Sequence, residues 1–297
     1  MENNIALNST NRGLIKKRRK ERLIKILAMA FVYFVLLLMY APIIYITIFS
    51  FTEHTTTGIW DGFSFGNYIN LFNYSGNRIS QNIWNAVGNT ALVAVTSAFV
   101  STILGTLGAI GIFYTRKKQI KNTLDFVTQI PVVNAEIVTA VSLCILFVIC
   151  QSFLPRSFIT LVIGHVVLSV PYVVMSVKPK LEQMDPSLYE AAMDLGATHV
   201  QALWKVTIPD IIPGILSGFL LSITLSLDDY VITVFTKPTT GNFETISTYV
   251  DAVTKRSGLP AQIRAFTAIL FAVILIVMVL MNVRSSRNAK KIYRKGD

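Results

Sequence analysis

Residues 185–209, DPSLYEAAMDLGATHVQALWKVTIP, carry the start and stop signals of two short helices. Asp185 can cap the first helix, because its carboxylate accepts hydrogen bonds from the unpaired backbone N–H groups of the first turn. Pro186 suits the first helical position, and Gly196 supplies the backbone freedom that ends the helix. The residues between them are expected to divide into an apolar stripe that packs, Leu188, Ala191, Ala192 and Leu195, and residues that point elsewhere, Tyr189, Glu190 and Asp194.

The second helix of this segment is predicted to begin at a capping box. Thr198 and Gln201 have the T-x-x-Q spacing in which each side chain bonds the backbone N–H of the other residue. Leu203 and Trp204 follow on this helix, and Pro209 is expected to end it, because proline has no N–H to donate. The two helices together form a compact cassette.

The rest of the chain has the composition of a membrane protein. Of its 297 residues, 53% are hydrophobic and only 14% are charged, whereas about a quarter of the residues in soluble domains are charged. A helix needs roughly 20 apolar residues to cross a bilayer. Six stretches are predicted to do so: residues 24–50, 84–113, 124–150, 158–177, 212–236 and 264–283.

Basic residues orient these spans. If six spans alternate, one side carries 21 of the 27 Lys and Arg residues, including both terminal segments and the cassette, and the other side carries 6. The positive-inside rule then places both termini and the cassette in the cytoplasm. We therefore expect a basic N-terminal tail over residues 1–23, a transmembrane domain over 24–283 and a basic C-terminal tail over 284–297.

The cassette has a different charge balance from the other cytoplasmic segments. Between Lys178 and Asp210, three basic residues stand against five acidic ones. A segment that rests on anionic lipid, or one that binds DNA, should be basic. The acidic balance therefore favours a protein partner, and no nucleic acid is expected to bind.

The cassette resembles the EAA loop of binding-protein-dependent ABC importer permeases. This resemblance rests on the spacing of Glu190, Ala191, Ala192, Gly196, Val206, Ile208 and Pro209. It implies an all-α membrane protein with the six-helix type I importer permease fold, in which the loop between spans four and five couples to a cytoplasmic ATPase. The coupling residues are then Glu190, Ala191, Ala192, Asp194, Gly196 and Pro209. An ordinary capped helical hairpin between two spans is the alternative.

Small residues and prolines indicate how the spans pack. The second span carries a face suited to close helix packing, made of Ala94, Ser97, Ala98, Ser101, Gly105, Gly108 and Gly111. Pro131 and Pro171 interrupt the third and fourth spans. We expect a kinked third span to help line a cavity, since a cavity can satisfy the backbone groups that proline frees.

Three carboxylates lie well away from the inner ends of the predicted spans, and an acidic residue costs about 2.5–3.5 kcal/mol to insert at the helix centre. Glu136 is expected near the midplane of the third span, and Asp228 and Asp229 near the outer end of the fifth. No Lys or Arg lies in the interior of the spans to neutralise them, which favours a passing cation; a buried structural pair or a protonated carboxyl is the alternative. Successive helical residues diverge by about 100°, so one aspartate is expected to face the cavity while the other bonds locally. Tyr230 can add a cation–π contact to this substrate pathway.

A second resemblance covers about half of the chain. The segments SLDD at 226–229 and PVVNAEIVTAVSL at 131–143 look like those of PotC-type permeases from spermidine and putrescine importers. This resemblance implies a polyamine substrate and a bacterial cell membrane location. It also implies a heterodimer with a PotB-type permease, two copies of a cytoplasmic ABC ATPase and an extracellular polyamine-binding protein.

The chain has no G-x-x-x-x-G-K-[ST] phosphate loop. We therefore expect ATP and Mg²⁺ in the partner ATPase, and neither catalysis nor a cofactor in this subunit. His54, His165 and His199 are scattered along the chain, which predicts neither a metal site nor a catalytic triad. The alternatives are an importer permease for another cation or small solute, such as thiamine or ferric iron, an ion-coupled carrier independent of ATP, and a membrane scaffold that recruits a protein through the cassette.

Overall fold

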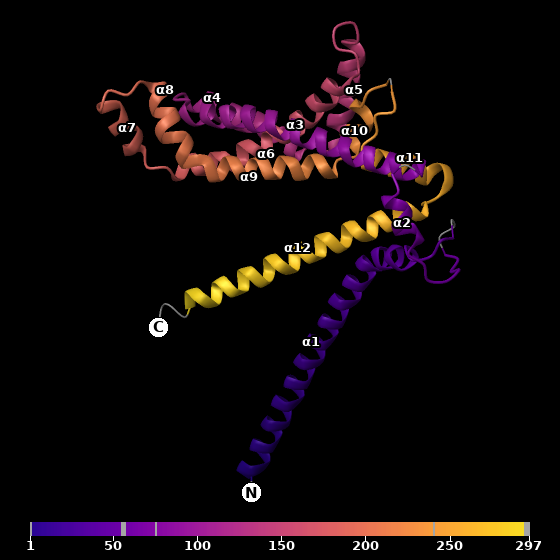
Figure 1. The fold of residues 1–297 in the computed structure, drawn as a ribbon. Helices are drawn as coiled ribbons and strands as arrows, with labels where there is room; N and C mark the ends of the chain where they lie inside the picture. The colour runs from indigo at the N-terminus through magenta and orange to yellow at the C-terminus, as the bar shows by residue number, and fades with distance from the viewer. Residues whose placement is uncertain (1, 55–57, 75, 240, 294–297) are drawn as a thin grey trace. The chain divides into compact units, whose positions relative to one another are not determined.

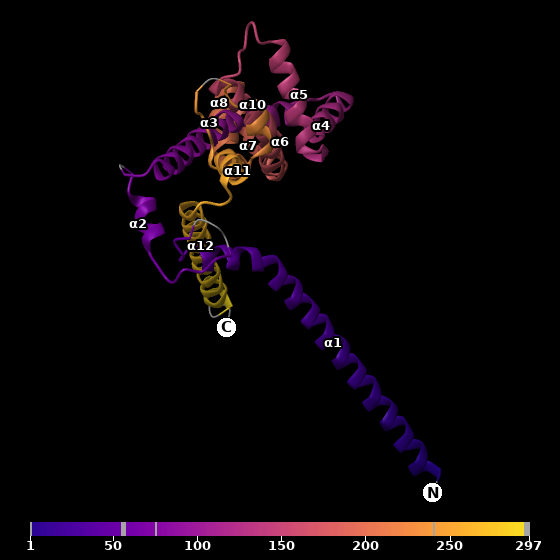
Figure 2. The same ribbon diagram turned by 90° about the vertical axis from the view of Figure 1, so that its right-hand side faces the viewer.

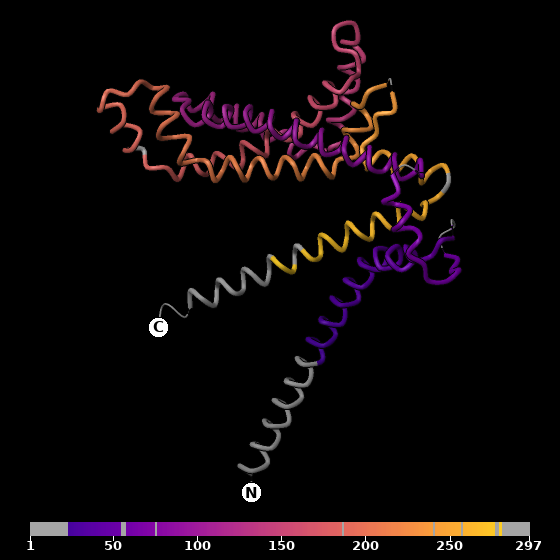
Figure 3. Tube along the Cα trace, in the orientation of Figure 1, coloured from indigo at the N-terminus to yellow at the C-terminus, as the bar shows by residue number. Residues whose placement is uncertain are grey.

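The computed structural model describes residues 2–54, 58–74, 76–239 and 241–293, and every regular element in these ranges is a helix (Figures 1 and 3). The chain divides into two compact units, one of residues 78–257 and one of residues 1–77 with 258–297.

Three long helices form the body of the larger unit: α3 (Arg78–Tyr114), α6 (Phe158–Gln183) and α9 (Ile208–Asp228). They lie side by side (Figures 1 and 2). Their shared core includes Ala109 of α3, Val173 and Val177 of α6 and Ile211 of α9, each of which is fully buried.

Hydroxyl pairs join α3 to α9 within this body. Ser97 donates to Ser226 Oγ over 3.2 Å, and one helical turn later Ser101 donates to Ser222 Oγ over 3.1 Å. All four side chains are buried, so each hydroxyl finds its partner on the neighbouring helix rather than in water. The small-residue face predicted on the second span is therefore confirmed around these serines.

Glycine allows α3 and α6 to approach closely at one point. A Cβ atom on Gly105 would lie 2.6 Å from the Cβ of Val173, closer than packed side chains tolerate. Further along α3, a Cβ on Gly108 would make an ordinary contact, and one on Gly111 would meet nothing within 4 Å. The prediction that Gly111 belongs to the packing face is wrong, because Gly111 is exposed on another side of α3, while Ile110 and Ile112 beside it are buried in the core shared with α6 and α9.

The predicted third span is two helices rather than one. α4 (Lys118–Val133) and α5 (Glu136–Ile149) meet at 102°. The backbone of Asn134 and Ala135 between them is extended, with ψ of 147° and 130°. The expected kink at Pro131 is thus a full break one turn later, and Glu136 begins a new helix instead of lying within a continuous one.

Pro209 does not end the helix that starts at the cassette, contrary to the prediction. α8 (His199–Ala202), a π-helical turn (Leu203–Thr207) and α9 form one helical run over His199–Asp228. The N–H of Ile208 donates to the carbonyl of Leu203, five residues back. Pro209 then lies in the first turn of α9, where its missing N–H costs little and the wide π turn leaves room for its ring.

The predicted fifth span also ends early. α9 stops at Asp228, and α10 (Val231–Thr236) begins after a break at Asp229 and Tyr230. A single helix over 212–236 is therefore wrong, because the carboxylate of Asp229 starts a new helix by accepting its first free N–H groups. α11 (Ile246–Ser257) follows and is tied to α3, since the N–H of Ile246 donates to Thr90 Oγ1 over 2.8 Å.

The smaller unit contains α1 (Glu2–Phe49), α2 (Gly66–Phe72) and α12 (Ala261–Tyr293). Leu23–Phe49 of α1 is long and apolar enough to cross a membrane, as are α3, α6 and His199–Asp228, and the bent pair α4 and α5 makes a fifth candidate. The apolar part of α12, Ala261–Ile276, is shorter, so the sixth span stays a prediction. The two basic tails lie mostly outside the residues whose side chains the structure describes.

Candidate functional site

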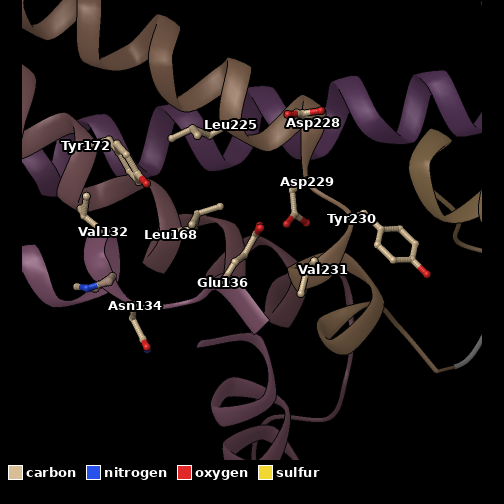
Figure 4. A pocket seen from close by; sticks show the side chains of 11 residues that line it. Val132, Asn134, Glu136, Leu168, Tyr172, Leu225, Asp228, Asp229, Tyr230 and Val231 are labelled. Carbon is tan, nitrogen blue, oxygen red and sulfur yellow. The ribbon is translucent and has the colours of Figure 1, made fainter. Parts of the chain in front are cut away.

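A cavity of about 270 Å³ lies in the larger unit, where the ends of α4, α5, α9 and α10 meet α6 (Figure 4). Both breaks in the predicted spans open onto it. Its lining residues are Pro131, Val132, Asn134, Glu136, Leu168, Tyr172, Leu225, Asp228, Asp229, Tyr230 and Val231.

Three carboxylates line this cavity. Glu136 is the first residue of α5, Asp228 is the last residue of α9, and Asp229 lies in the break that follows. The side chains of Glu136 and Asp229 point toward one another (Figure 4). None of the residues lining the described cavity is basic. The space is therefore acidic without an internal counter-ion.

The helix ends make the three carboxylates unequal. Glu136 and Asp229 lie at the N-termini of α5 and α10, where the partial positive charge of a helix favours an anion. Asp228 lies at the C-terminus of α9, where the unpaired carbonyl groups already carry partial negative charge. The electrostatic demand for a cation is therefore strongest beside Asp228, whose side chain is also exposed.

Asp229, by contrast, is held by its neighbours on α10. Its Oδ1 accepts the N–H of Ile232 at 3.1 Å, and its Oδ2 accepts the N–H and the hydroxyl of Thr233 at 2.8 and 2.7 Å. Only 5% of the residue is exposed. The expected local bonding of one aspartate is thus found at Asp229, although both aspartates line the cavity because the helix breaks between them.

A buried histidine extends this arrangement into α6. His165 is 1% exposed, and its Nε2 lies 3.1 Å from Thr233 Oγ1 and 3.6 Å from Asp229 Oδ2. Its Nδ1 lies 2.9 Å from Ser226 Oγ of α9. Sequence reasoning missed this group, because it tested histidine spacing for metal ligands and triads. The available signal was the pair Asp229 and Thr233 at i, i+4, next to an uncharged span that carries a histidine.

Tyr230 does not present its ring to the other acids. It lines the cavity, but in Figure 4 its side chain points away from Glu136 and Asp229. Its hydroxyl donates to Asp251 Oδ2 of α11 at 2.8 Å, and Lys255 Nζ donates to the same oxygen at 2.8 Å. These hydrogen bonds, the one from Lys255 first, lower the pKa of Asp251. Tyr230 therefore ties the cavity to α11, and its cation–π role stays a prediction.

The cassette has the predicted caps. α7 (Pro186–Asp194) begins where Asp185 Oδ1 accepts the N–H of Ser187 at 3.0 Å, a bond that lowers the pKa of Asp185. It ends at Asp194, and Gly196 just beyond the end has a φ of +86°, a conformation that other residues rarely adopt. The reciprocal bonds between Thr198 and Gln201 measure 3.0 and 3.3 Å and confirm the capping box.

The expected packing stripe of α7 is not buried. Leu188 is 51% exposed and Leu195 is 88% exposed. Tyr189, which was expected to point elsewhere, faces the rest of the unit: its ring lies 5.4 Å from that of Tyr114, and its hydroxyl is 3.1 Å from His199 Nδ1. An aromatic anchor thus orients the helix, and the apolar stripe is left at the surface.

The exposed surface of the cassette combines apolar and acidic side chains. Val200 and Trp204 are 64% and 65% exposed and extend the apolar stripe beyond α7. Glu190 and Asp194 are exposed on the same short helix. We call the exposed side chains of Leu188, Glu190, Asp194, Leu195, Val200 and Trp204 the cassette surface. Large apolar side chains gathered in this way are typical of a surface that another protein covers.

Residues 101–287 match the model of the binding-protein-dependent transport system inner membrane component family. The chain belongs to this family. The match includes the cassette and all three carboxylates of the cavity. As a member of this family with several apolar helices, the chain is a multi-pass membrane subunit.

Relatives extend over much of the chain. The putrescine transport system permease protein PotI of Escherichia coli (strain K12) is 33% identical over 201 residues, which are 66% of this chain and 69% of PotI. The spermidine/putrescine transport system permease protein PotC of Haemophilus influenzae is 31% identical over 259 residues, 87% of this chain and 96% of that protein. The resemblance seen in the sequence is confirmed.

Solved structures have the same fold. A bacterial alginate ABC transporter in complex with an alginate pentasaccharide-bound periplasmic protein matches with a TM-score of 0.64 at 18% identity, over 90% of this chain and 94% of that one. The MetNI methionine ABC transporter matches with a TM-score of 0.57 at 15% identity, over 71% of this chain and 98% of that one. The type I importer permease fold is confirmed.

Proposed function

We propose that the chain is the permease subunit of an ATP-driven importer of polyamines. The observation that carries this proposal is the cavity lined by Glu136, Asp228 and Asp229 without a basic residue. A polyamine brings several ammonium groups on a flexible apolar chain. Each ammonium can offset one carboxylate, and Leu168 and Leu225 in the same lining offer apolar contact to the methylenes between them.

The relatives support this choice of substrate over another cation. PotI and PotC are both described as polyamine permeases, and PotC is matched over 96% of its length. Ferric iron would need converging ligands of fixed geometry. A polyamine needs only separated carboxylates, which Asp228 at one helix end and Glu136 at another provide.

The proposed assembly has a second permease of the PotB type, two copies of a cytoplasmic ABC ATPase and an extracellular polyamine-binding protein. Both termini and the cassette lie in the cytoplasm. ATP and Mg²⁺ bind to the ATPase, and this subunit catalyses no reaction. The cassette surface supports this assignment, since its exposed apolar and acidic side chains suit a groove on a protein partner.

One continuous helical run connects the cassette to the cavity. This run, His199–Asp228, begins immediately after Thr198 and ends at Asp228, whose carboxylate lies at the negative C-terminal end of α9. Because its backbone is helical throughout, this run links the cassette to α9 mechanically. Closure of the ATPases on the cassette would therefore move Asp228 and change which side of the membrane the cavity faces.

Uptake of labelled putrescine and spermidine tests the proposal. The chain is co-expressed with its partner permease, ATPase and binding protein in cells that lack other polyamine uptake. Asp228→Asn should reduce uptake at least tenfold, whereas Asp61→Asn makes the same chemical change at a carboxylate 52% exposed outside the cavity and should have no effect. Uptake of thiamine or ferric iron in place of polyamines would refute the substrate, and polyamine uptake without the ATPase would refute the energy source.

A further inference from the structure

A line of hydrogen bonds runs from α6 to the cavity. His165 Nε2 lies 3.1 Å from Thr233 Oγ1, which in turn donates to Asp229 Oδ2 over 2.7 Å. The other ring nitrogen of His165 lies 2.9 Å from Ser226 Oγ. The side chains of His165 and Asp229 are 1% and 0% exposed, so water does not compete for these bonds.

The direction of these bonds follows from the number of hydrogens. A hydroxyl has a single hydrogen, and Thr233 gives its own to the carboxylate of Asp229. Thr233 Oγ1 can then only accept from His165, so Nε2 of His165 carries a hydrogen. Nδ1 of the neutral ring is then an acceptor, so Ser226 donates its hydroxyl hydrogen to Nδ1. Ser226 Oγ in turn accepts the hydroxyl of Ser97.

This line fixes which way Asp229 faces. With Oδ2 held by the hydroxyl and the N–H of Thr233 and Oδ1 held by the N–H of Ile232, the carboxylate has little freedom to rotate. It is held directed at Glu136 (Figure 4). The same contact region brings α10 against α6, where a Cβ on Gly164 would lie 2.8 Å from Ile232 Cγ2.

We propose that His165 is a positioning residue for the cation site, acting through Thr233 on Asp229. The proposal rests on the proposed function, because it takes the cavity to be where the polyamine binds. His165 itself contacts no substrate. It holds one wall of the site, so that Glu136 and the exposed Asp228 are the carboxylates free to adjust to the ammonium groups.

Two substitutions of His165 separate positioning from bulk packing. The amide nitrogen of glutamine can reach the place of Nε2 and donate to Thr233, whereas asparagine reaches only the place of Nδ1. His165→Asn should raise the KM for putrescine about tenfold, because without His165 the hydrogen bond from Thr233 to the charged Asp229 is weakened. His165→Gln should stay within about threefold of the native KM, and Vmax per assembled complex should change less than about twofold in both.

Thr233→Val removes the middle of the line with almost no change in shape, and it should raise the KM as much as His165→Asn does. The double variant should be no worse than either single one, because both interrupt the same line. Thr236→Val is the matched control, since the buried hydroxyl of Thr236 donates to Ile232 O of the same helix and not to Asp229. A native KM in Thr233→Val, additive effects in the double variant, or equal loss in His165→Gln and His165→Asn would overturn the proposal.

A spectroscopic measurement tests His165 without any transport. The chain has 3 histidines, so ¹⁵N-histidine NMR of the assembled complex can assign His165 by the signal missing in His165→Gln. Nε2 should carry a hydrogen, and its resonance should shift in Thr233→Val but not in Thr236→Val. An Nε2 without hydrogen would refute the positioning role. If the native complex imports no polyamine, the proposed substrate is refuted. The NMR measurement still tests whether His165 donates to Thr233.

Discussion

Asp228 and Asp229 are adjacent in sequence, yet the same substitution should affect them differently. Asp229 is 5% exposed and accepts three hydrogen bonds from Ile232 and Thr233, whereas Asp228 is exposed at the end of α9. Asparagine has nearly the shape of aspartate but only one acceptor oxygen. Asp229→Asn therefore leaves at least one donor of α10 facing an NH₂ group, and Asp228→Asn removes only charge.

The size of the difference follows from these bonds. A hydrogen bond to a charged acceptor contributes about 1.5–3 kcal/mol, and a buried donor left unpaired costs about 1–3 kcal/mol. Asp229→Asn should therefore destabilise the larger unit by about 3 kcal/mol. Asp228→Asn should change its stability by less than about 0.5 kcal/mol, as expected for an exposed substitution away from any cap or pair.

Thermal unfolding of the purified complex in detergent measures this contrast, with uptake measured in parallel. Asp229→Asn should lower Tm by about 5–10 °C and should also reduce uptake, while Asp228→Asn should reduce uptake at an unchanged Tm. Equal Tm values for the two variants would refute the idea that Asp229 holds the start of α10. A lower Tm for Asp228→Asn alone would reverse the assignment of the two residues.

Three further predictions concern packing and coupling. Gly105→Ala should lower Tm, because the added methyl group would overlap Val173 and overpacking of this kind costs about 1–3 kcal/mol. Gly111→Ala adds a methyl group in open space and should not lower Tm. Similar Tm values for the two variants would argue against close approach of α3 and α6. Gly196→Asp should reduce polyamine-stimulated ATP hydrolysis to the basal rate, because φ of +86° strains any side chain at the end of α7, and an unchanged stimulated rate would remove Gly196 from the coupling path. Because the pKa of Asp185 is lowered in the folded protein, its cap stabilises α7 fully at pH values above the ordinary pKa of 3.8, and this stabilisation is lost as the pH falls through the lower folded pKa. Between pH 6 and 8 (roughly the neutral range), Asp185 should therefore add no pH dependence to the coupled ATPase activity. Different pH profiles for native and Asp185→Asn in this range would contradict this.

The local signals in the sequence predicted the cassette well. The predicted helix ends are found at Asp185, at Gly196 and at the pair Thr198 and Gln201. They could be predicted because a cap depends on a few neighbouring backbone groups and little else. The stripe of α7 was predicted less well. Helical spacing identifies a face of a helix but not what packs against it. Here Tyr189 packs against Tyr114, which is distant in the sequence, so another face of α7 is turned to the rest of the unit.

The breaks near the cavity could not be predicted from apolar runs. A hydropathy pattern shows that a segment is long enough to cross a membrane, but not that its helix stops within it. α10 starts because Asp229 caps it, and the buried carboxylate is satisfied by Ile232 and Thr233 of α10, with His165 of α6 bonded to Thr233 behind them. Such a network depends on helix packing that period and composition do not record.

The two breaks explain why carboxylates are tolerated in this membrane domain. In a continuous span a buried acid would face only apolar side chains and paired backbone. A helix that starts inside the domain provides free N–H groups, and these stabilise Asp229 on α10 and favour Glu136 on α5. Asp228 has the opposite environment, because the unpaired carbonyl groups at the end of α9 place partial negative charge beside its carboxylate. The fold therefore satisfies Asp229 from within. It leaves the exposed Glu136 and Asp228 to a cation from outside, and Asp228 lies at the end of the helical run that begins at the cassette.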